Sequence, residues 1–210
     1  MAKHYYENRG DKFLRIFSIA LIVFAIIMAF VFFTITGRFV SAYDNLVNLQ
    51  DNVTLAETNI EAMMKKRLEI IPQLVEIVEA HTNNEEKVFK EVLNTNETLA
   101  EILNSGYTLE KIGEANDYLT TAVNKLIDVA EANLEITTDE SYVELMNQLQ
   151  ERVNKISEAR EKYNMAVYEY NRNINCFPGN LLAPVLGFKE IEYFQAEGQE
   201  SSINLVNVEE

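Results

Sequence analysis

The sequence is poor in the residues that build most metal and disulfide sites. Its 210 residues include one cysteine, Cys176, and two histidines, His4 and His81. A single cysteine excludes an intrachain disulfide, and one cysteine with two scattered histidines cannot supply a clustered zinc site. A carboxylate-bridged di-metal site in a helix bundle needs two Glu-x-x-His elements, and no glutamate lies three residues before His81. We therefore expect neither a metal nor a cofactor.

Motifs for catalysis and residues for tight turns are also scarce. The chain has no Gly-x-Ser-x-Gly element, no P-loop and no Gly-x-Gly-x-x-Gly element. It has seven glycines, three prolines and no tryptophan, and no strand-like alternation of useful length. So little glycine is typical of a chain with few tight turns and long helices. The sequence predicts an all-α protein that is not an enzyme.

Charge is absent from one long segment near the N-terminus. The 21 residues 16–36, IFSIALIVFAIIMAFVFFTIT, contain no charged side chain. About 20 helical residues cross a bilayer core of roughly 30 Å, so this run predicts a single-pass transmembrane helix over residues 13–37, after a short tail at 1–12. The alternative is a secretory signal cleaved after Val40-Ser41-Ala42. A signal has a shorter apolar core, so the length of the run favours retention.

Basic residues are distributed unevenly about this segment. Four precede it, whereas Arg38 stands alone after it until Lys65; the four are Lys3, Arg9, Lys12 and Arg15. The richer side tends to stay cytoplasmic, which predicts a cytoplasmic N-terminus and an extracytoplasmic domain in the cell membrane. Residues 37–210 hold 14 basic and 31 acidic residues, a formal charge of −17. Such a surface repels phosphate backbones and anionic headgroups, so we expect no nucleic-acid partner and a domain that stands off the membrane.

Heptad spacing predicts the first long helix after the apolar run. One apolar set is Leu46, Val53, Ile60 and Leu74, interrupted by Arg67, and the other is Leu49, Ala56, Met63, Ile70 and Ile77. Alternating steps of three and four residues keep one stripe facing a partner helix, as in a coiled coil. Pro72 lies inside this pattern and removes one helical hydrogen bond, so we expect a kink there.

A second stripe of every seventh residue predicts the last long helix. Its members are Tyr142, Leu149, Ile156, Tyr163, Tyr170 and Phe177. Thr138 or Asp139 can cap its start, and Pro178-Gly179 ends it. Two shorter amphipathic stretches lie between, up to Ser105-Gly106 and from Thr108 onward. The sequence therefore predicts an antiparallel four-helix bundle with two long helices over residues 38–194, followed by a flexible acidic tail at 195–210.

Three stretches of the chain resemble the LemA family. They are YDNLVNLQDNV at residues 43–53, RLEIIPQLVEIV at 67–78, and AREKYNMAVYEYNRNINCFPGNLLAPVLGF at 159–188. The resemblance spans about residues 43–194. It implies a bacterial-type protein with one N-terminal membrane helix and an α-helical bundle. It implies no enzymatic activity, because none is established for the family as a whole.

The chain departs from the family pattern at three places. Glu57 stands where the family usually has tryptophan, Asn133-Leu134 lacks the usual proline, and Arg152-Val153-Asn154 replaces Thr-Glu-Asn. The signature residues that match, and that we single out as candidate partner-contacting or structural positions, are Arg67, Pro72, Arg160, Tyr163, Asn164, Tyr170, Asn171, Phe177, Pro178, Gly187 and Phe188.

Two Tyr-Asn pairs lie seven residues apart in the last helix. Tyr163 and Tyr170 belong to the apolar stripe, so their rings should pack inside with the hydroxyls at the edge. Asn164 and Asn171 fall one position around the helix, at the boundary of the bundle. With Arg160 they would form a polar ladder that fixes the register of the helices, or else line a groove for a partner.

The apolar stretch after Pro178 invites a structural interpretation. Phe177 would be the last buried member of its stripe, and the chain would then reverse at Gly179 and close over the end of the bundle. The residues of this expected lid are Leu181, Leu182, Val185, Leu186 and Phe188. If they are exposed instead, they form an apolar patch that needs a partner.

Three hypotheses for function follow. The first is a membrane-tethered scaffold or adaptor for other membrane or envelope proteins, with homo-oligomers possible. The second is a ligand-sensing bundle that relays to a partner through the membrane helix, and the third is an unrecognised hydrolase. The basic cluster Lys65-Lys66-Arg67 would either contact an anionic ligand or partner, or pair with acidic neighbours in the same chain.

Overall fold

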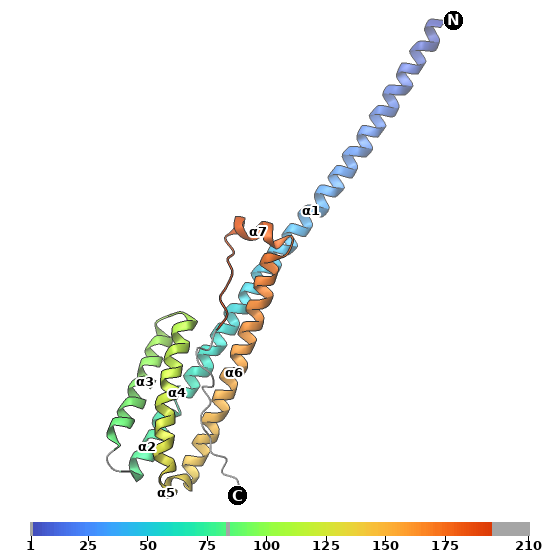
Figure 1. The fold of residues 1–210 in the computed structure, drawn as a ribbon. Helices are drawn as coiled ribbons and strands as arrows, with labels where there is room; N and C mark the ends of the chain where they lie inside the picture. The colour runs from blue at the N-terminus through green and yellow to red at the C-terminus, as the bar shows by residue number, and fades with distance from the viewer. Residues whose placement is uncertain (1, 83–84, 195–210) are drawn as a thin grey trace. The chain divides into compact units, whose positions relative to one another are not determined.

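The part of the chain that the structure describes is mainly helical. A computed structural model describes residues 2–82 and 85–194, with side chains described from residue 14 onward. These residues form seven helices and no strand: α1 (Ala2–Leu68), α2 (Ile71–His81), α3 (Glu86–Asn104), α4 (Leu109–Glu131), α5 (Leu134–Thr137), α6 (Glu140–Asn175) and α7 (Gly179–Leu186) (Figure 1). The all-α prediction is confirmed, whereas the antiparallel four-helix arrangement stays a prediction. The tail predicted at 195–210 lies outside the described residues.

The helices divide into two compact units. The N-terminal unit comprises Met1–Asn48 together with Asn173–Lys189. The core unit comprises Leu49–Arg172 together with the chain from Glu190 onward, which is described as far as Phe194. Both long helices, α1 and α6, contribute residues to each unit.

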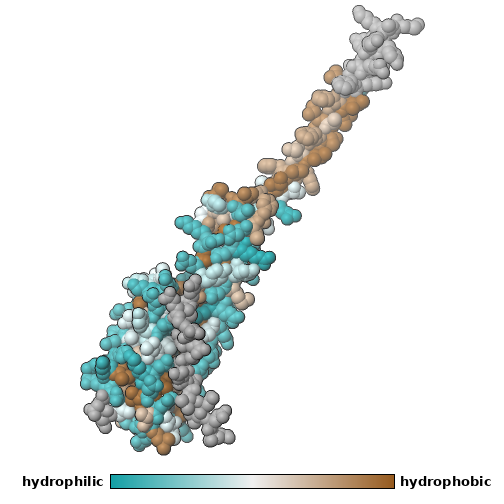
Figure 2. Space-filling model, viewed as in Figure 1, coloured by the Kyte–Doolittle hydropathy of each residue, from teal (hydrophilic) through white to brown (hydrophobic). Residues whose placement is uncertain are grey.

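Helix α1 carries the uncharged run and continues well past it. It begins at Ala2 and so includes the residues predicted as a short tail, and Gly37 does not interrupt it. The apolar side chains of the run are exposed, and they form the band of hydrophobic surface in Figure 2. The helix is long and apolar enough to cross a membrane.

One of the two predicted heptad sets reaches the core, whereas the other, apart from Ile70, is half-buried. Val53, Ile60 and Leu74 are buried, and Arg67 is buried with them. Helix α1 ends at Leu68 and α2 begins at Ile71, with Pro72 in the first turn of α2. In place of the predicted kink inside one helix, the helix ends and a new one begins, and Pro72 sits where its missing N–H costs no helical hydrogen bond.

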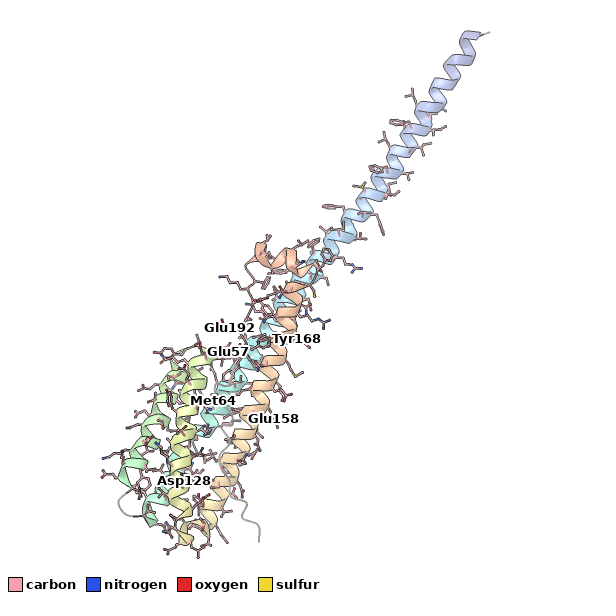
Figure 3. The ribbon with its side chains drawn as sticks, viewed as in Figure 1. Glu57, Met64, Asp128, Glu158, Tyr168 and Glu192 are labelled. Carbon is pink, nitrogen blue, oxygen red and sulfur yellow. The ribbon has the colours of Figure 1, made fainter. Side chains whose placement is uncertain are left out.

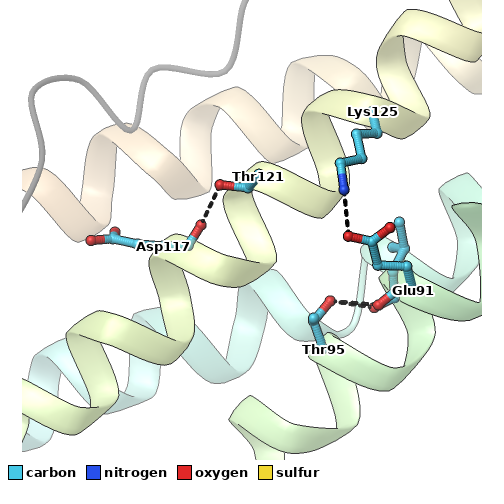
Figure 4. A network of polar contacts seen from close by, with 6 residues as sticks. Glu91, Thr95, Asp117, Thr121 and Lys125 are labelled. Carbon is cyan, nitrogen blue, oxygen red and sulfur yellow. Dashed lines mark hydrogen bonds and ion pairs between the residues drawn. The ribbon is translucent and has the colours of Figure 1, made fainter.

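Helices α2 to α5 complete the core unit. Helix α3 packs along α4, and α2 contacts α3, α4 and α5. On the outer side Lys125 of α4 pairs with Glu91 of α3 (Figure 4). In the same view Thr95 and Thr121 donate hydrogen bonds to the carbonyls of Glu91 and Asp117, one turn back along their own helices.

Helix α6 follows its predicted stripe until its last member. The Asp139 carboxylate accepts hydrogen bonds from the N–H groups of Ser141 and Tyr142, so it caps the helix as expected. The stripe is buried from Tyr142 to Tyr170, but Phe177 is 76% exposed. The prediction for Phe177 is wrong, because the helical region is disfavoured for the residue before a proline. The helix ends at Asn175, and Phe177 no longer follows the seven-residue spacing.

The expected lid is wrong for three of its five residues, whereas Leu182 and Phe188 are half-buried. The stretch after Pro178 forms helix α7, which buries Gly179 and Ala183 and leaves Leu181, Val185 and Leu186 exposed. Gly179 and Ala183 lie four residues apart on one face, so α7 packs through its small residues. Gly187 ends the helix with a φ of 83°, and its N–H donates to the Ala183 carbonyl.

Candidate functional site

The two asparagines of the Tyr-Asn pairs hold the last described stretch of the chain, residues 190–194, which we call the C-terminal segment. The Asn171 side chain donates to the Ile191 carbonyl (2.8 Å) and accepts from the Ile191 N–H (3.0 Å). The Asn164 side chain donates to the Phe194 carbonyl (3.1 Å) and accepts from the Phe194 N–H (2.8 Å). Each asparagine thus satisfies both backbone polar groups of one residue.

The spacing of the two asparagines fits an extended chain. Seven helical residues at 1.5 Å rise cover about 10.5 Å. Three residues of extended chain, from Ile191 to Phe194, cover about 10 Å. The two repeats therefore match, with the segment running antiparallel to α6. These four hydrogen bonds all reach backbone atoms, so they fix the register of the segment whatever its side chains are.

A tyrosine of the same two pairs also holds the C-terminal segment. Tyr163 and Tyr170 are buried, as predicted from the stripe, and the Tyr163 hydroxyl donates to the Glu192 carbonyl at 3.2 Å. The hydroxyl of Tyr163 thus bonds between the two asparagine contacts. In place of the predicted ladder between helices, Asn164 and Asn171 hold the C-terminal segment.

Phe194 anchors the segment in the core unit. It is 7% exposed, and the Arg160 guanidinium carbon lies 4.6 Å from its ring centroid, within the range of a cation–π contact. On the α4 side, a Cβ atom added to Gly113 would lie 3.1 Å from the Phe194 ring. Glycine at this helical position therefore makes room for the ring.

Arg67 is a buried cation bonded to α4. It is 2% exposed; its Nη1 donates to the Asn116 side-chain oxygen at 2.6 Å and its Nη2 to the Thr120 hydroxyl at 3.0 Å. Its neighbours Lys65 and Lys66 are exposed, so the basic cluster seen in the sequence is divided between core and surface. Arg67 therefore ties the end of α1 to α4.

The two arginines form one electrostatic group. Burial, reinforced by the like charge of Arg160, lowers the pKa of Arg67 to about 10, against the opposing effect of Asp117. The pKa of Arg160 is also lowered, chiefly by burial and again against Asp117. Both remain charged at neutral pH, and the Asp117 carboxylate is the countercharge they share.

The Tyr163 hydroxyl faces an acidic environment. Burial raises its pKa to about 12, and the charges of Glu57 and Glu192 act in the same direction. Burial also raises the pKa of Glu57, helped by the neighbouring Glu61. Figure 3 labels Glu57 and Glu192 close to one another. The phenol is therefore held neutral well above its ordinary range.

An open groove lies on the outer face of α6, beside the asparagine contacts. It is lined by Glu161, Asn164, Met165, Tyr168 and Glu169. Met165 and Tyr168 are more than half exposed, and Tyr168 is labelled in Figure 3. An apolar strip between two carboxylates suits a partner segment that combines an apolar anchor with positive charge.

The remaining signature residues lie in the N-terminal unit. The Phe188 ring lies 6.2 Å from the Tyr43 ring of α1, measured between centroids. The Asn45 side chain donates to the Asn173 side chain at 3.1 Å, which joins α1 to the end of α6. Pro178 stands at the start of α7 and Gly187 at its end. Gly187 and Phe188 therefore fix α7 against α1.

Sequence reasoning missed the partners of the signature residues. Asn116 and Thr120 accept hydrogen bonds from Arg67, and Gly113 makes room for the Phe194 ring. All three partner residues lie on α4. A glycine inside an amphipathic helix without a turn signal was the available clue to a close approach. Ile191 and Phe194 carried no such signal, because they sit in a short stretch without periodicity.

Comparison with known proteins agrees with this arrangement of motifs. The LemA family model matches residues 56–209, which is most of the chain. This chain belongs to the LemA family. The family match includes the Arg67 element, both Tyr-Asn pairs and the C-terminal segment that they hold.

Two curated relatives of this LemA-family chain are magnetosome proteins. Magnetosome protein MamQ 2 of Paramagnetospirillum magneticum (strain AMB-1) is 25% identical over 175 residues, which cover 73% of this chain. Magnetosome protein MamQ of Magnetospirillum gryphiswaldense (strain MSR-1) is 22% identical over 174 residues, or 72% of this chain. The aligned part covers 64% of the length of each relative. Together with the long apolar helix, these relatives indicate a membrane-associated LemA-family protein.

Proposed function

We propose that this LemA-family protein is a membrane-anchored scaffold or adaptor without enzymatic activity. Helix α1 crosses the membrane once through residues 16–36, with the N-terminus in the cytoplasm and an antiparallel four-helix bundle outside. The bundle presents a docking face to other membrane or envelope proteins. The proposal concerns this chain, and no magnetosome role is transferred to it.

The proposal is supported by the contacts of the polar signature residues, which bond within the protein itself. Arg67 bonds to Asn116 and Thr120, and Asn164 and Asn171 bond to the backbone of the C-terminal segment. These side chains stabilise the fold. The exposed surface beside them, around Met165 and Tyr168, is apolar and flanked by carboxylates. Such a surface supports binding of a partner.

The docking proposal is tested by photocrosslinking in living cells. A photoreactive amino acid replaces Tyr168 in the groove, and Glu158, also on α6 and exposed, is the matched control position. We expect a discrete protein adduct from position 168 that is absent from position 158, and its loss in a Glu161→Lys background. Equal adducts from both positions, or none from 168, would contradict a docking face on this groove.

Topology is tested through the only cysteine of the chain. Cys176 is exposed, so a membrane-impermeant maleimide reports its side of the membrane directly. We expect labelling in intact cells from which any outer barrier has been removed. Labelling only after the cells are lysed would place the domain in the cytoplasm and reject the proposed orientation.

The second candidate, a ligand-sensing bundle, is favoured by one observation. Among the described residues, Nε of Arg67 and both Nε and Nη2 of Arg160 are buried without a hydrogen-bond partner. Buried cationic N–H groups of this kind suit a small anion. A sensor should melt at a higher temperature in the presence of such a ligand, for instance inorganic phosphate. An unchanged melting temperature across phosphate and small carboxylates favours the scaffold.

A further inference from the structure

Helix α7 carries an apolar surface that is exposed within the part of the chain that the structure describes. Val185 is 82% exposed, and Leu181 and Leu186 are about half exposed. Phe177, just before the helix, is 76% exposed. We define these four residues as the α7 apolar face. Only Gly179 and Ala183 of α7 are buried. The side chains of the α7 apolar face are therefore exposed, whereas Leu182 is half-buried.

The position of α7 is fixed close to the end of the apolar run. Phe188 packs on Tyr43, and Asn173 bonds to Asn45, so α7 lies beside the stretch of α1 just after Thr36. Tyr43 is seven residues beyond Thr36, or about 10 Å along a helix. A headgroup layer is about 5–8 Å thick. The thickness of this layer and the length of one side chain together cover the distance from Thr36 to Tyr43. Figure 1 draws α7 across the direction of α1.

Charge distinguishes this region from the remainder of the domain. Residues 49–172 hold 12 basic and 24 acidic residues, whereas residues 37–48 and 173–189 hold Arg38, Lys189 and a single acid, Asp44. The general repulsion between an acidic domain and anionic headgroups therefore does not apply here. Two cations near the headgroups add attraction.

We propose that α7 is an interfacial helix that lies on the membrane crossed by α1, with its apolar face among the headgroups and upper acyl chains. The apolar surface of the span and that of α7 then form one continuous membrane-contacting surface. An amphipathic helix in this position buries its apolar residues to a depth of about 5–10 Å. The proposal rests on the proposed membrane span, and it sets where the domain is held relative to the bilayer.

The absence of tryptophan in the chain makes a direct test possible. A single tryptophan is introduced in turn by Val185→Trp, by Phe24→Trp in the middle of the span, and by Leu134→Trp at an exposed apolar position of α5. Each full-length variant is placed in nanodiscs of phosphatidylethanolamine and phosphatidylglycerol. Emission is measured with phospholipids that carry a nitroxide either near the headgroup or near the chain end. Phe177→Trp is the second α7 variant, because it exchanges one exposed aromatic residue for another.

The expected pattern separates the two proposals. Val185→Trp and Phe177→Trp lose most of their emission to the shallow nitroxide, Phe24→Trp to the deep one, and Leu134→Trp to neither. If Phe24→Trp is quenched but both α7 variants are not, the span stands and the interfacial helix is rejected. Blue-shifted but unquenched emission from the α7 variants would show cover by protein and likewise reject it. If Phe24→Trp is unquenched, the membrane span itself is rejected.

Discussion

At the scale of single residues, the two asparagines of α6 account for the attachment of the C-terminal segment. Replacing Asn164 with Ala removes two hydrogen bonds and leaves the Phe194 N–H and carbonyl without their partner. We expect a loss of about 1–3 kcal/mol in the free energy of unfolding. Hydrogen–deuterium exchange of the Phe194 amide should become faster, as measured by mass spectrometry of a peptide spanning residues 190–194.

The control for this change is Asn154→Ala, on the exposed side of the same helix. The Asn154 side chain accepts a hydrogen bond from Gln150 but makes no described contact with the C-terminal segment. Exchange in residues 190–194 should be unaffected by it. Equal protection of the segment in the Asn164→Ala protein would show that the asparagine does not hold it.

Gly113 and Phe194 provide a prediction about packing. Alanine at position 113 gains helix propensity of about 1 kcal/mol over glycine, but its Cβ would lie 3.1 Å from the Phe194 ring. We therefore expect Gly113→Ala to be more favourable in a Phe194→Ala background than in the native chain. Denaturant unfolding of the four proteins of this double-mutant cycle gives the coupling directly. Zero coupling would mean that the packing of the Phe194 ring does not depend on glycine at position 113.

The raised pKa of Tyr163 predicts a dependence of stability on alkaline pH. The folded-state pKa is about 12 against an ordinary value near 10, so the stabilising contribution is fully present below pH 10 and is lost as pH rises toward 12. Tyr163→Phe removes both this contribution and the hydrogen bond to Glu192. The native chain should thus be more stable than the variant at pH 8, with the gap shrinking by pH 12.

Comparing the two proteins removes the effect of other groups that titrate in this range. Arg67 acts in the opposite sense, because its pKa is lowered on folding, and Tyr142 acts in the same sense as Tyr163. Both are present in the native chain and in the variant. Urea midpoints followed by circular dichroism provide the measurement, and a gap that stays constant from pH 8 to pH 12 would contradict the prediction.

Periodicity was enough to identify the buried stripes, but not the partners of the polar residues. The burial of Val53, Ile60, Tyr163 and Tyr170 follows from seven-residue spacing alone. The same spacing placed Asn164 and Asn171 on one line of α6, where either a neighbouring helix or an extended chain satisfies them. Choosing between these requires knowing where residues 190–194 lie, which depends on long-range packing.

At the scale of elements, the ends of helices were predictable where a proline or a capping residue marks them. Asp139 caps α6 as expected, and Pro72 marks a break in the helical pattern, although as the start of a new helix and not as a kink. Helix α7 was not predictable by the same means. Its apolar residues favoured burial in a lid, whereas the small pair Gly179 and Ala183 determines which face packs. The size of side chains on each face mattered more than their total hydrophobicity.

Gly179 is the residue on which the reversal between α6 and α7 depends. A Cβ atom at this position would lie 2.0 Å from the Asn173 carbonyl oxygen, a backbone atom that cannot move alone. Gly179→Ala should therefore displace α7 from its position in the N-terminal unit. A spin label on Cys176 should report the change as altered mobility.

The matched control is Gly37→Ala, in the helical part of the same unit. Beyond the adjoining residues and the backbone of its own helix, nothing lies within 4 Å of a Cβ added there, so the substitution fits without displacement. The label on Cys176 should give the same spectrum as in the native sequence. If Gly179→Ala also leaves the spectrum unchanged, the close approach to Asn173 does not determine where α7 lies.

At the scale of the whole molecule, the distribution of charge and apolar surface follows the chain. An uncharged run is followed by a nearly neutral stretch, and the strong negative charge begins only in the core unit. This order agrees with a protein whose parts meet hydrocarbon, headgroups and water in turn. For the span, the contact with hydrocarbon could be predicted from the sequence. For α7, its place beside the end of the span became evident only from the contacts of Phe188 and Asn173 with α1.

The proposed anchoring role of the apolar run predicts which form of the protein is found in membranes. If the run is retained as a span, peptides covering residues 16–42 should be recovered by mass spectrometry from the membrane-extracted chain. The protein should also stay with the membrane fraction after an alkaline carbonate wash. Arginine at both Ile26 and Ile27 should release it, because each charge at the centre of a span costs about 2.5–3.5 kcal/mol of insertion free energy. A chain that begins at Tyr43 would instead show cleavage after Ala42 and identify the run as a signal sequence.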